Sequence, residues 1–261
     1  MVDYYLKYLK YKSKYLKVMK GGEKIGKGAF GIVFRPPLFF EIRDPEYESR
    51  KYVGKIMKLE DAIAELKNSD IVKALDPDGE WSVTIKKLEP VNQSQIDTDL
   101  ESGDLKKFPV QLISEFKGVS LKNLIGMEDE EVNCKTMKMQ NTPLFFNLIK
   151  KLVPILINLN KTHLHNDIHF GNFVYDETDD IVRVMDFGKL IKSDGSEGKT
   201  VNENLTDLTE LFIQIQQVYN CAKKHPRFAH VLQGFPTNPH IDPTPERYAE
   251  AILSIPDLSL L

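Results

Sequence analysis

The chain has 261 residues, of which 28% are charged and 41% are hydrophobic, and its net charge is −3. This composition is typical of a globular protein with a sizeable core, and the net charge provides no general attraction to nucleic acid or membranes. The two cysteines, Cys134 and Cys221, are far apart in the sequence, so we expect no disulfide framework and a reducing, cytoplasmic location. No apolar run reaches the roughly 18 residues of a membrane span, and the N-terminus lacks the apolar core of a secretion signal.

The N-terminal segment 2–20 is basic and rich in tyrosine. It contains six lysines interleaved with tyrosine and leucine, and it has no proline or glycine. This pattern predicts a helix that ends at Gly21 and Gly22, so that residues 1–22 form a separate N-terminal element. Such a helix either packs on the surface of the domain or binds an anionic partner, which would be an acidic protein, a nucleic acid or a membrane surface.

The rest of the chain changes from strand-rich to helix-rich. Up to residue 115 the apolar runs are mostly short and bounded by glycine, proline or polar residues, as in strands. Beyond that point apolar residues recur at helical spacing over longer stretches. This order predicts an α+β fold with two lobes, a β-rich N-lobe at 23–115 and a helical C-lobe at 116–261. We expect strands at 32–34, 52–57, 81–88 and 110–116, and helices at 60–68, 144–162, 205–219 and 245–254.

Three oxygen-bearing side chains surround a predicted hairpin of two short strands, 172–175 and 181–185. Asp167 and Asn172 lie on the loop that leads into the first strand, and Asp186 directly follows the second. A hairpin would bring all three side chains to one edge. Magnesium prefers oxygen ligands, and a carboxylate can accept the proton of an attacking hydroxyl. The pattern therefore predicts a site for phosphoryl transfer.

The histidines of the same stretch allow another interpretation. His163, His165 and His169 could form a zinc site, because histidine is a common zinc ligand. Alternatively, His165 is a buried structural residue that is bonded to nearby backbone. No cysteine or further histidine lies close by in the sequence, so we favour the structural role.

The run from His165 to Asn172, followed by Asp186-Phe187-Gly188, resembles the catalytic loop and the Asp-Phe-Gly motif of the eukaryotic-type protein kinase superfamily. The resemblance implies a two-lobed protein-kinase-like fold, with ATP as the phosphate donor and Mg²⁺ as the cofactor. It also implies that Asp167 is the catalytic base and that Asn172 and Asp186 hold magnesium. The motifs of the family occur in the correct order between residues 23 and 220.

A glycine cluster precedes the first predicted strand and is similar to the loop that covers the phosphates of ATP in this family. Glycine lets backbone N–H groups approach phosphate closely. A hairpin that contains glycine but binds no ligand is the alternative. The resemblance assigns nucleotide binding to Ile25, Gly26, Gly28, Gly31 and Val33.

Lys55, within Val53-Gly54-Lys55-Ile56, resembles the strand lysine that contacts the α- and β-phosphates. Glycine at position 54 replaces a commoner aliphatic residue or alanine. The resemblance makes Glu65 the carboxylate that pairs with this lysine, although only ten residues separate the two. Lys58 is the alternative phosphate contact, and Glu65 is alternatively a solvated helix carboxylate.

Two further segments resemble parts of the same family. The segment around Glu115 and Lys117 is similar to the hinge whose backbone binds adenine, although an ordinary strand-to-loop junction would have the same pattern. Asp207 is similar to the helix aspartate that supports the backbone of the catalytic loop, or it is a carboxylate that favours a helix N-terminus.

The resemblance implies a serine/threonine protein kinase whose protein substrate is unknown, but the chain departs from the family in three places. Asn166 replaces the usual arginine, His169 replaces the usual lysine, and no Ala-Pro-Glu follows Asp-Phe-Gly. Histidine at that position is more typical of choline and aminoglycoside phosphotransferases, so a small-molecule kinase is one alternative. A catalytically silent kinase-like scaffold is another. The tyrosine- and lysine-rich N-terminus resembles leaders on proteins of large DNA viruses, which would place the protein in the host cytoplasm or in a virion.

Overall fold

The structure is a computed structural model of the chain, and it describes residues 22–28, 31–38, 46–47, 49–90, 110–127, 132–194, 207–232 and 244–258. The basic helix expected at 2–20 lies outside the described residues. The described part combines antiparallel sheets with helices, which confirms the predicted α+β class.

The chain divides into two compact units. The first comprises Met1–Gly79 and Val83–Phe116, and the second comprises Glu80–Ser82 and Lys117–Leu261. The main crossing from one unit to the other therefore lies between Phe116 and Lys117, close to the expected lobe boundary at 115. The short segment Glu80–Ser82 belongs to the second unit, which the sequence did not indicate.

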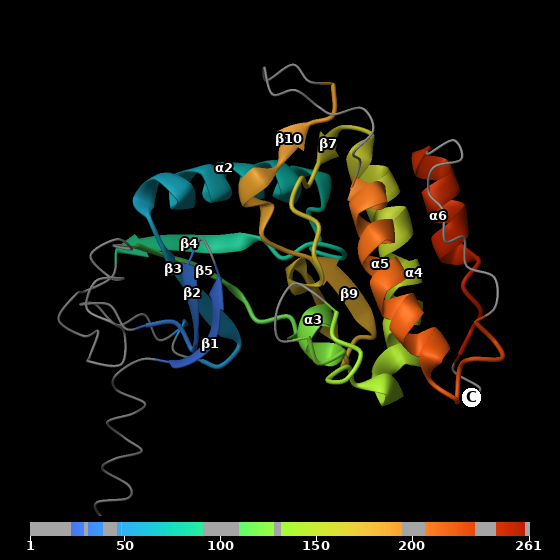
Figure 1. Cartoon of the computed structure of the whole chain (residues 1–261). Helices are drawn as coiled ribbons and strands as arrows, with labels where there is room; N and C mark the ends of the chain where they lie inside the picture. The colour runs from blue at the N-terminus through green and yellow to red at the C-terminus, as the bar shows by residue number, and fades with distance from the viewer. Residues whose placement is uncertain are drawn as a thin grey trace, which may run out of the picture. The chain divides into compact units, whose positions relative to one another are not determined.

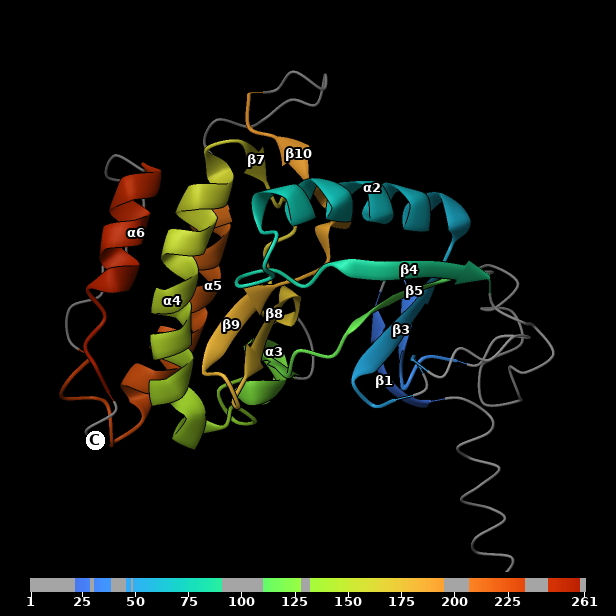
Figure 2. The same ribbon diagram turned by 180° about the vertical axis from the view of Figure 1, so that it is seen from behind.

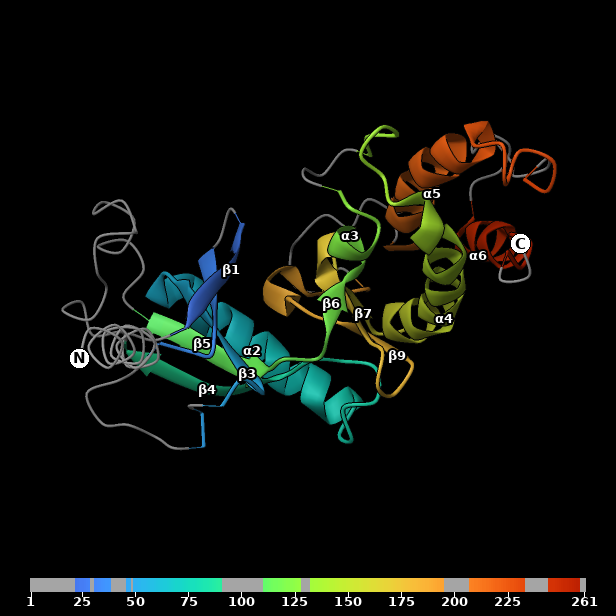
Figure 3. The same cartoon turned by 90° about the horizontal axis from the view of Figure 1, so that it is seen from below.

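The first unit contains a five-stranded antiparallel sheet in the order β1-β2-β3-β5-β4, and Figure 3 labels β1, β3, β4 and β5 of this sheet. The prediction of one strand over 81–88 is wrong at its start, because β4 begins only at Ile85. Ser82 instead forms a bridge with Val184 in the second unit. The strands are β1 (Glu23–Gly28), β2 (Gly31–Arg35), β3 (Tyr52–Met57), β4 (Ile85–Pro90) and β5 (Val110–Glu115).

Helix α2 (Leu59–Leu75) packs on β4 and β5 of this sheet (Figure 1). It continues well beyond the predicted end at residue 68. Ala62, Glu65, Ser69 and Val72 form its buried face, at the three- and four-residue spacing of one side of a helix. Three of these four side chains are small or apolar, so the buried carboxylate of Glu65 requires a partner.

Three helices of the second unit pack against one another (Figure 2). They are α4 (Thr142–Asn160), α5 (Asp207–Lys224) and α6 (Pro245–Leu253). Helix α4 is a core helix, because its apolar residues lie at helical spacing and nine of its residues are buried; α5 has ten buried residues. Within the described residues, Met139–Asn160 is the one helical stretch that is long and apolar enough to cross a membrane by length and composition, and half of its apolar window is buried inside the protein.

Short strands of the second unit surround the predicted hairpin. Strands β8 (Phe173–Asp176) and β9 (Ile181–Val184) form this hairpin, and β6 (Val119–Ser120) pairs with β8; the short helix α3 (Leu121–Leu124) follows β6. Before and after the hairpin, β7 (His163–Leu164) pairs with β10 (Ile191–Lys192). Two 3₁₀ turns, η4 (Phe170–Asn172) and η5 (Phe187–Lys189), connect these strands; a third, η3 (Met139–Asn141), precedes α4.

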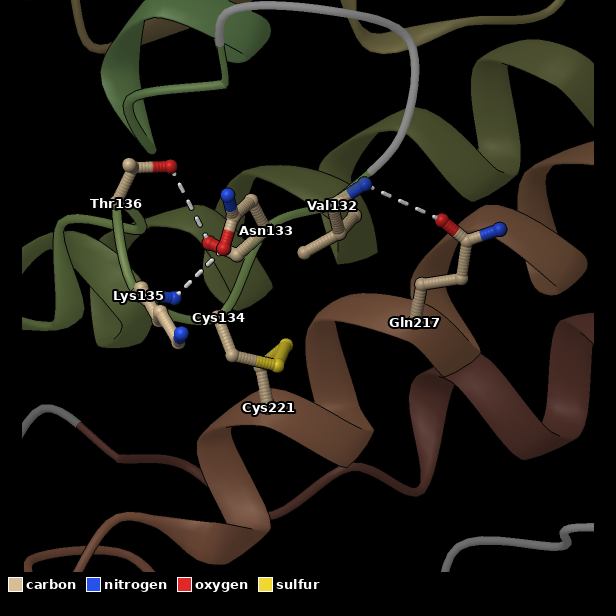
Figure 4. Close-up of a disulfide and its surroundings, with 7 residues drawn as sticks. All are labelled: Val132, Asn133, Cys134, Lys135, Thr136, Gln217 and Cys221. Carbon is tan, nitrogen blue, oxygen red and sulfur yellow. Dashed lines mark hydrogen bonds between the residues drawn. A yellow bond between two sulfur atoms is a disulfide. The ribbon is translucent and has the colours of Figure 1, made fainter.

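The two cysteines form a disulfide, although the sequence led us to expect no disulfide framework. Cys134 lies in the segment before α4 and Cys221 lies near the end of α5, with their Cα atoms 5.1 Å apart (Figure 4). The N–H of Val132 also donates to Gln217 Oε1 on the same helix, at 3.5 Å. Distance along the sequence is therefore a poor guide here, because packing of the helices brings together cysteines 87 residues apart.

Candidate active site

Asp207 at the start of α5 holds the loop of residues 165–172, which we call the Asp167 loop. Its Oδ2 accepts the backbone N–H of His165 at 2.7 Å, and its Oδ1 accepts that of Asn166 at 3.0 Å. Burial raises the pKa of the Asp207 carboxyl, and the two N–H donors act in the opposite direction. The expected support of this loop by Asp207 is confirmed.

Asn166 has a left-handed backbone, with φ of 59°. Asparagine tolerates this conformation better than most residues do. Asp207 holds the N–H of Asn166 itself and that of the preceding His165, so the carboxylate fixes the turn that precedes Asp167.

Glu210 and Gln214 extend the same support, and neither was among the site residues expected from the sequence. Glu210 Oε2 accepts the N–H of Ile168 at 3.3 Å, and the Gln214 amide donates to the carbonyl of Ile168. Burial raises the pKa of Glu210, as do the nearby carboxylates of Asp207 and Asp167. Glu210 and Gln214 lie three and seven residues after Asp207, so helical periodicity could have identified them.

His165 is a buried structural residue, as favoured over a zinc ligand. Its side chain is 0% exposed, and its Nε2 donates to the carbonyl of Met185 at 2.9 Å. The other two histidines have different neighbours, since His163 Nδ1 lies 3.0 Å from the Thr162 hydroxyl and His169 Nδ1 accepts the N–H of Gly171. Within the described residues no group of three or more His, Cys, Asp or Glu side chains is placed to hold a metal.

Asn172 and Asp186 are brought together by the hairpin. Phe173 pairs with Val184 at its open end, and the N–H of Met185 donates to the carbonyl of Asn172 at 2.9 Å. Asp186 follows immediately in a left-handed backbone conformation, with φ of 62°. An aspartate in this sparsely populated region is held by its surroundings, and such residues are frequent at functional sites.

The side chains of Asn172 and Asp186 are suitable magnesium ligands. Asn172 Nδ2 donates to the carbonyl of Asp167 at 3.0 Å, which fixes the amide and leaves its oxygen as the atom for a metal. Magnesium in phosphate-binding sites commonly takes only one or two protein ligands, and phosphates and water supply the rest. A carboxylate and an amide oxygen fit this requirement without a larger cluster of acidic residues.

Asp167 lies between Asn172 and a lysine. Its backbone carbonyl accepts from Asn172, and its Oδ1 accepts from Lys189 Nζ at 2.8 Å. The side chain of Asp167 is 20% exposed, so a small polar group can reach it. The pairing with Lys189 was not expected from the sequence, because no fixed spacing links the two residues.

In the first unit, Lys55 and Glu65 form an ion pair. Lys55 Nζ lies 2.9 Å from Glu65 Oε2, and the two side chains are 16% and 8% exposed. Strand β3 leads into α2 after Lys58 alone, so a separation of ten residues is enough for the two side chains to meet. Glu65 is thus a buried, paired carboxylate and not a solvated one, while its role toward ATP stays a prediction.

Packing explains why glycine occupies position 54, beside Lys55. A Cβ at this position would collide with the side-chain amide of Gln111. Gln111 is buried and binds the backbone of Leu38 on both sides: its Nε2 donates to the carbonyl at 3.0 Å and its Oε1 accepts the N–H at 3.3 Å. The departure from an aliphatic residue at 54 therefore reflects the neighbouring Gln111.

The glycine cluster forms the β1–β2 hairpin of the first unit, with Gly28 opposite Gly31 and Gly26 opposite Val33. Gly31 is required by packing, because a Cβ would meet the carbonyl of Ile56. Gly26 has no such neighbour, since a Cβ there would meet only Val33 at 3.9 Å. Packing thus leaves the glycine at 26 unexplained, and close approach of a ligand is a reason to keep it. Ile25 on the same strand is exposed.

Glu115 ends β5 opposite Tyr52, and its carboxylate lies 3.5 Å from Lys86 Nζ. Lys117 is the first residue of the second unit after the crossing. The two residues therefore flank the connection between the units, where the resemblance places a hinge. Their contact with adenine stays a prediction.

The predicted site residues belong to separate units of the chain. The first unit contains the glycine hairpin, Lys55, Glu65 and Glu115, and the second contains Lys117, Asp167, Asn172 and Asp186. Within each unit the structure brings together residues that were expected to act together. In the first unit Lys55 bonds to Glu65. In the second, Asn172 bonds to the carbonyl of Asp167 through its side chain and to the N–H of Met185, the residue before Asp186, through its own carbonyl.

No protein-family model matches the chain, and no curated protein matches it. One similar solved structure is described as a Stt7 homologue from Micromonas algae soaked with ATP, with 17% sequence identity and a TM-score of 0.41. The similarity covers 64% of this chain and 48% of that one, so this chain matches about half of that protein's length.

Proposed function

We propose that this chain is an ATP-dependent phosphotransferase of the protein-kinase-like type, which transfers the γ-phosphoryl group to a serine or threonine hydroxyl of a protein. The observation that carries the proposal is the arrangement around Asn172. Its amide donates to the carbonyl of Asp167, and its own carbonyl accepts the N–H of the residue before Asp186. One asparagine thus couples the proposed base to the proposed metal ligand.

In the proposed reaction, Asp167 receives the acceptor hydroxyl. The hydroxyl oxygen forms a bond with the γ-phosphorus, and its proton passes to the Asp167 carboxylate. The bond between the γ-phosphorus and the β–γ bridging oxygen breaks, and ADP leaves with that electron pair. Asn172 and Asp186 would hold magnesium, which when bound neutralises charge on the phosphates.

The first unit would bind the nucleotide. Glu65 holds the Lys55 ammonium, which we assign to the α- and β-phosphates on the resemblance of the sequence. The backbone at Gly26 can approach phosphate, and backbone groups near Glu115 and Lys117 are assigned to adenine. Such placement of groups before the reaction is the main contribution that a protein makes to phosphoryl transfer.

A small-molecule kinase is the second candidate, and His169 favours it. The chain has histidine two residues after Asp167, where the resemblance to protein kinases would place lysine. In such an enzyme the same Asp167 would receive the hydroxyl of an amino alcohol or a sugar. The two candidates differ only in the acceptor, so the choice requires a test of substrates.

The function is tested in two steps with the whole chain. A thermal shift with ATP is measured with and without Mg²⁺, and phosphate transfer is then measured to a set of generic proteins and to choline and aminoglycosides. Transfer to protein that is lost in Asp167→Asn supports the proposal, and transfer only to small molecules selects the second candidate. Mg-ATP binding without any transfer would indicate a silent scaffold, and absence of binding would reject the phosphotransferase itself.

A further inference from the structure

Lys189 makes an ion pair at the centre of the proposed site. Its Nζ lies 2.8 Å from Asp167 Oδ1, and the side chains are 43% and 20% exposed. Exposed ion pairs contribute little to stability, so folding alone is a weak reason to keep a lysine here. Asp167 Oδ2 has no partner among the residues that the structure describes.

The Asp167 loop contains neither lysine nor arginine, so it offers a phosphate no permanently charged side chain. His165 is fully buried and directed at the carbonyl of Met185. His169 accepts the N–H of Gly171 through Nδ1, so this ring nitrogen is engaged with the backbone of the loop.

Lys189 is held in place on both sides along the chain. Phe187 is buried and its ring lies 5.2 Å from that of His165. The N–H of Leu190 donates to the carbonyl of Phe187 at 3.1 Å, and Ile191 pairs with Leu164 in the β10–β7 ladder. Lys189 thus extends from a fixed turn that begins directly after Asp186.

We propose that Lys189 is a catalytic residue of the phosphoryl transfer, and this inference rests on the proposed function. Before reaction its ammonium holds Asp167 Oδ1, which directs Oδ2 to the acceptor hydroxyl. During transfer the ammonium donates to an oxygen of the moving γ-phosphoryl group, while the hydroxyl proton passes to Asp167 and ADP departs. A fixed positive group beside developing charge is a principal source of stabilisation in such reactions.

The test compares Lys189→Met and Lys189→Arg with a matched control, Lys192→Met. Lys192 is an exposed lysine three residues further along the same segment. In Lys189→Met we expect kcat to fall roughly 100-fold or more, because one preorganised donor is lost. The arginine variant keeps the charge with a different shape, so it should recover part of the rate, and the control should behave as wild type.

A binding measurement gives a readout independent of turnover. The affinity for ADP with Mg²⁺ is compared with the affinity for ADP with Mg²⁺ and aluminium fluoride, which imitates the phosphoryl group in transfer. Lys189→Met should weaken the second far more than the first. Thermal melting of each variant establishes that it is folded.

Other results would overturn the inference. Unchanged or increased kcat in Lys189→Met would show that the ion pair is a surface contact or an inhibitory one. Equal weakening of both nucleotide complexes would place Lys189 in ground-state binding. A wild-type protein that transfers no phosphate rejects the proposed function and this inference with it, whereas an active wild type with an equally active Lys189→Met rejects this inference alone.

Discussion

The carboxylate of Asp207 accepts the backbone N–H of His165 at 2.7 Å, although 42 residues separate them in the sequence. The same carboxylate accepts the N–H of Asn166, and both Asp207 and His165 are buried. The start of one helix thereby determines the conformation of the loop that presents Asp167. Substitution of Asp207 should therefore affect both the stability of the protein and its activity.

Asp207→Ala should leave two N–H groups of the Asp167 loop without their acceptor. Buried donors without partners are costly, so we expect the free energy of unfolding to fall by about 2 kcal/mol or more. Urea titration measures this loss. Asn220→Ala on an exposed position of the same helix is the control. An Asp207→Ala protein as stable as the control would show that water or another group replaces the carboxylate.

Glu210 should make stability depend on pH. Its pKa is raised mainly by burial, so the folded protein binds the proton more tightly than the unfolded chain does. Stability should then fall as pH rises from the ordinary glutamate pKa through the raised one. Glu210→Gln keeps an oxygen for the N–H of Ile168 but cannot ionise, so its stability relative to wild type should increase over that range. Urea titrations across the acidic to neutral range would detect this, and parallel curves for both proteins would contradict it.

Asp186→Asn and Asp167→Asn should have different effects. Removal of the Asp186 charge weakens a magnesium ligand, so Mg²⁺-dependent nucleotide binding and turnover should both be lost. Asp167→Asn should preserve nucleotide binding and abolish transfer, because its proposed partner is the acceptor hydroxyl. Calorimetric titration with ATP, with and without Mg²⁺, separates the two. Equal turnover of Asp186→Asn and wild type would disprove the metal assignment.

Lys55→Met should reduce transfer by roughly 100-fold, and Lys58→Met should reduce it far less. Lys55 on β3 is paired with Glu65 on α2, whereas Lys58 is exposed directly before α2. Initial rates at saturating ATP give the comparison. A larger effect at Lys58 would assign the phosphate contact to that lysine.

Cys134→Ser should destabilise the second unit, because it removes a cross-link between the segment before α4 and helix α5. Disulfides typically contribute about 2–4 kcal/mol. A reductant should lower the melting temperature of wild type to that of Cys134→Ser and should leave the variant unchanged. Lys135→Ser, at the neighbouring exposed position, is the control. Two reactive thiols in the purified, unreduced wild type would show that the bridge is not formed.

Residue patterns along the chain predicted the helices and strands that depend mainly on neighbouring residues. Apolar residues at helical spacing identified α4, and the short apolar runs around residues 177–180 identified the β8–β9 hairpin. The five-residue spacing of Asp167 and Asn172, with Asp186 after the hairpin, indicated residues that the structure does hold together. The start of β4 was misplaced, because Trp81 and Ser82 have strand-forming neighbours but bond to Val184 within the second unit, to which both residues belong.

Such patterns did not predict contacts between segments that are far apart in the sequence. The α+β class, the hairpin and the order of the candidate site residues follow from the sequence alone, since each depends on periodicity or on neighbours along the chain. The contacts of Cys134 with Cys221, of Glu210 with Ile168 and of Lys189 with Asp167 became evident only in the folded chain. These contacts depend on how helices and turns pack, and packing is set by many side chains at once, not by spacing along one segment.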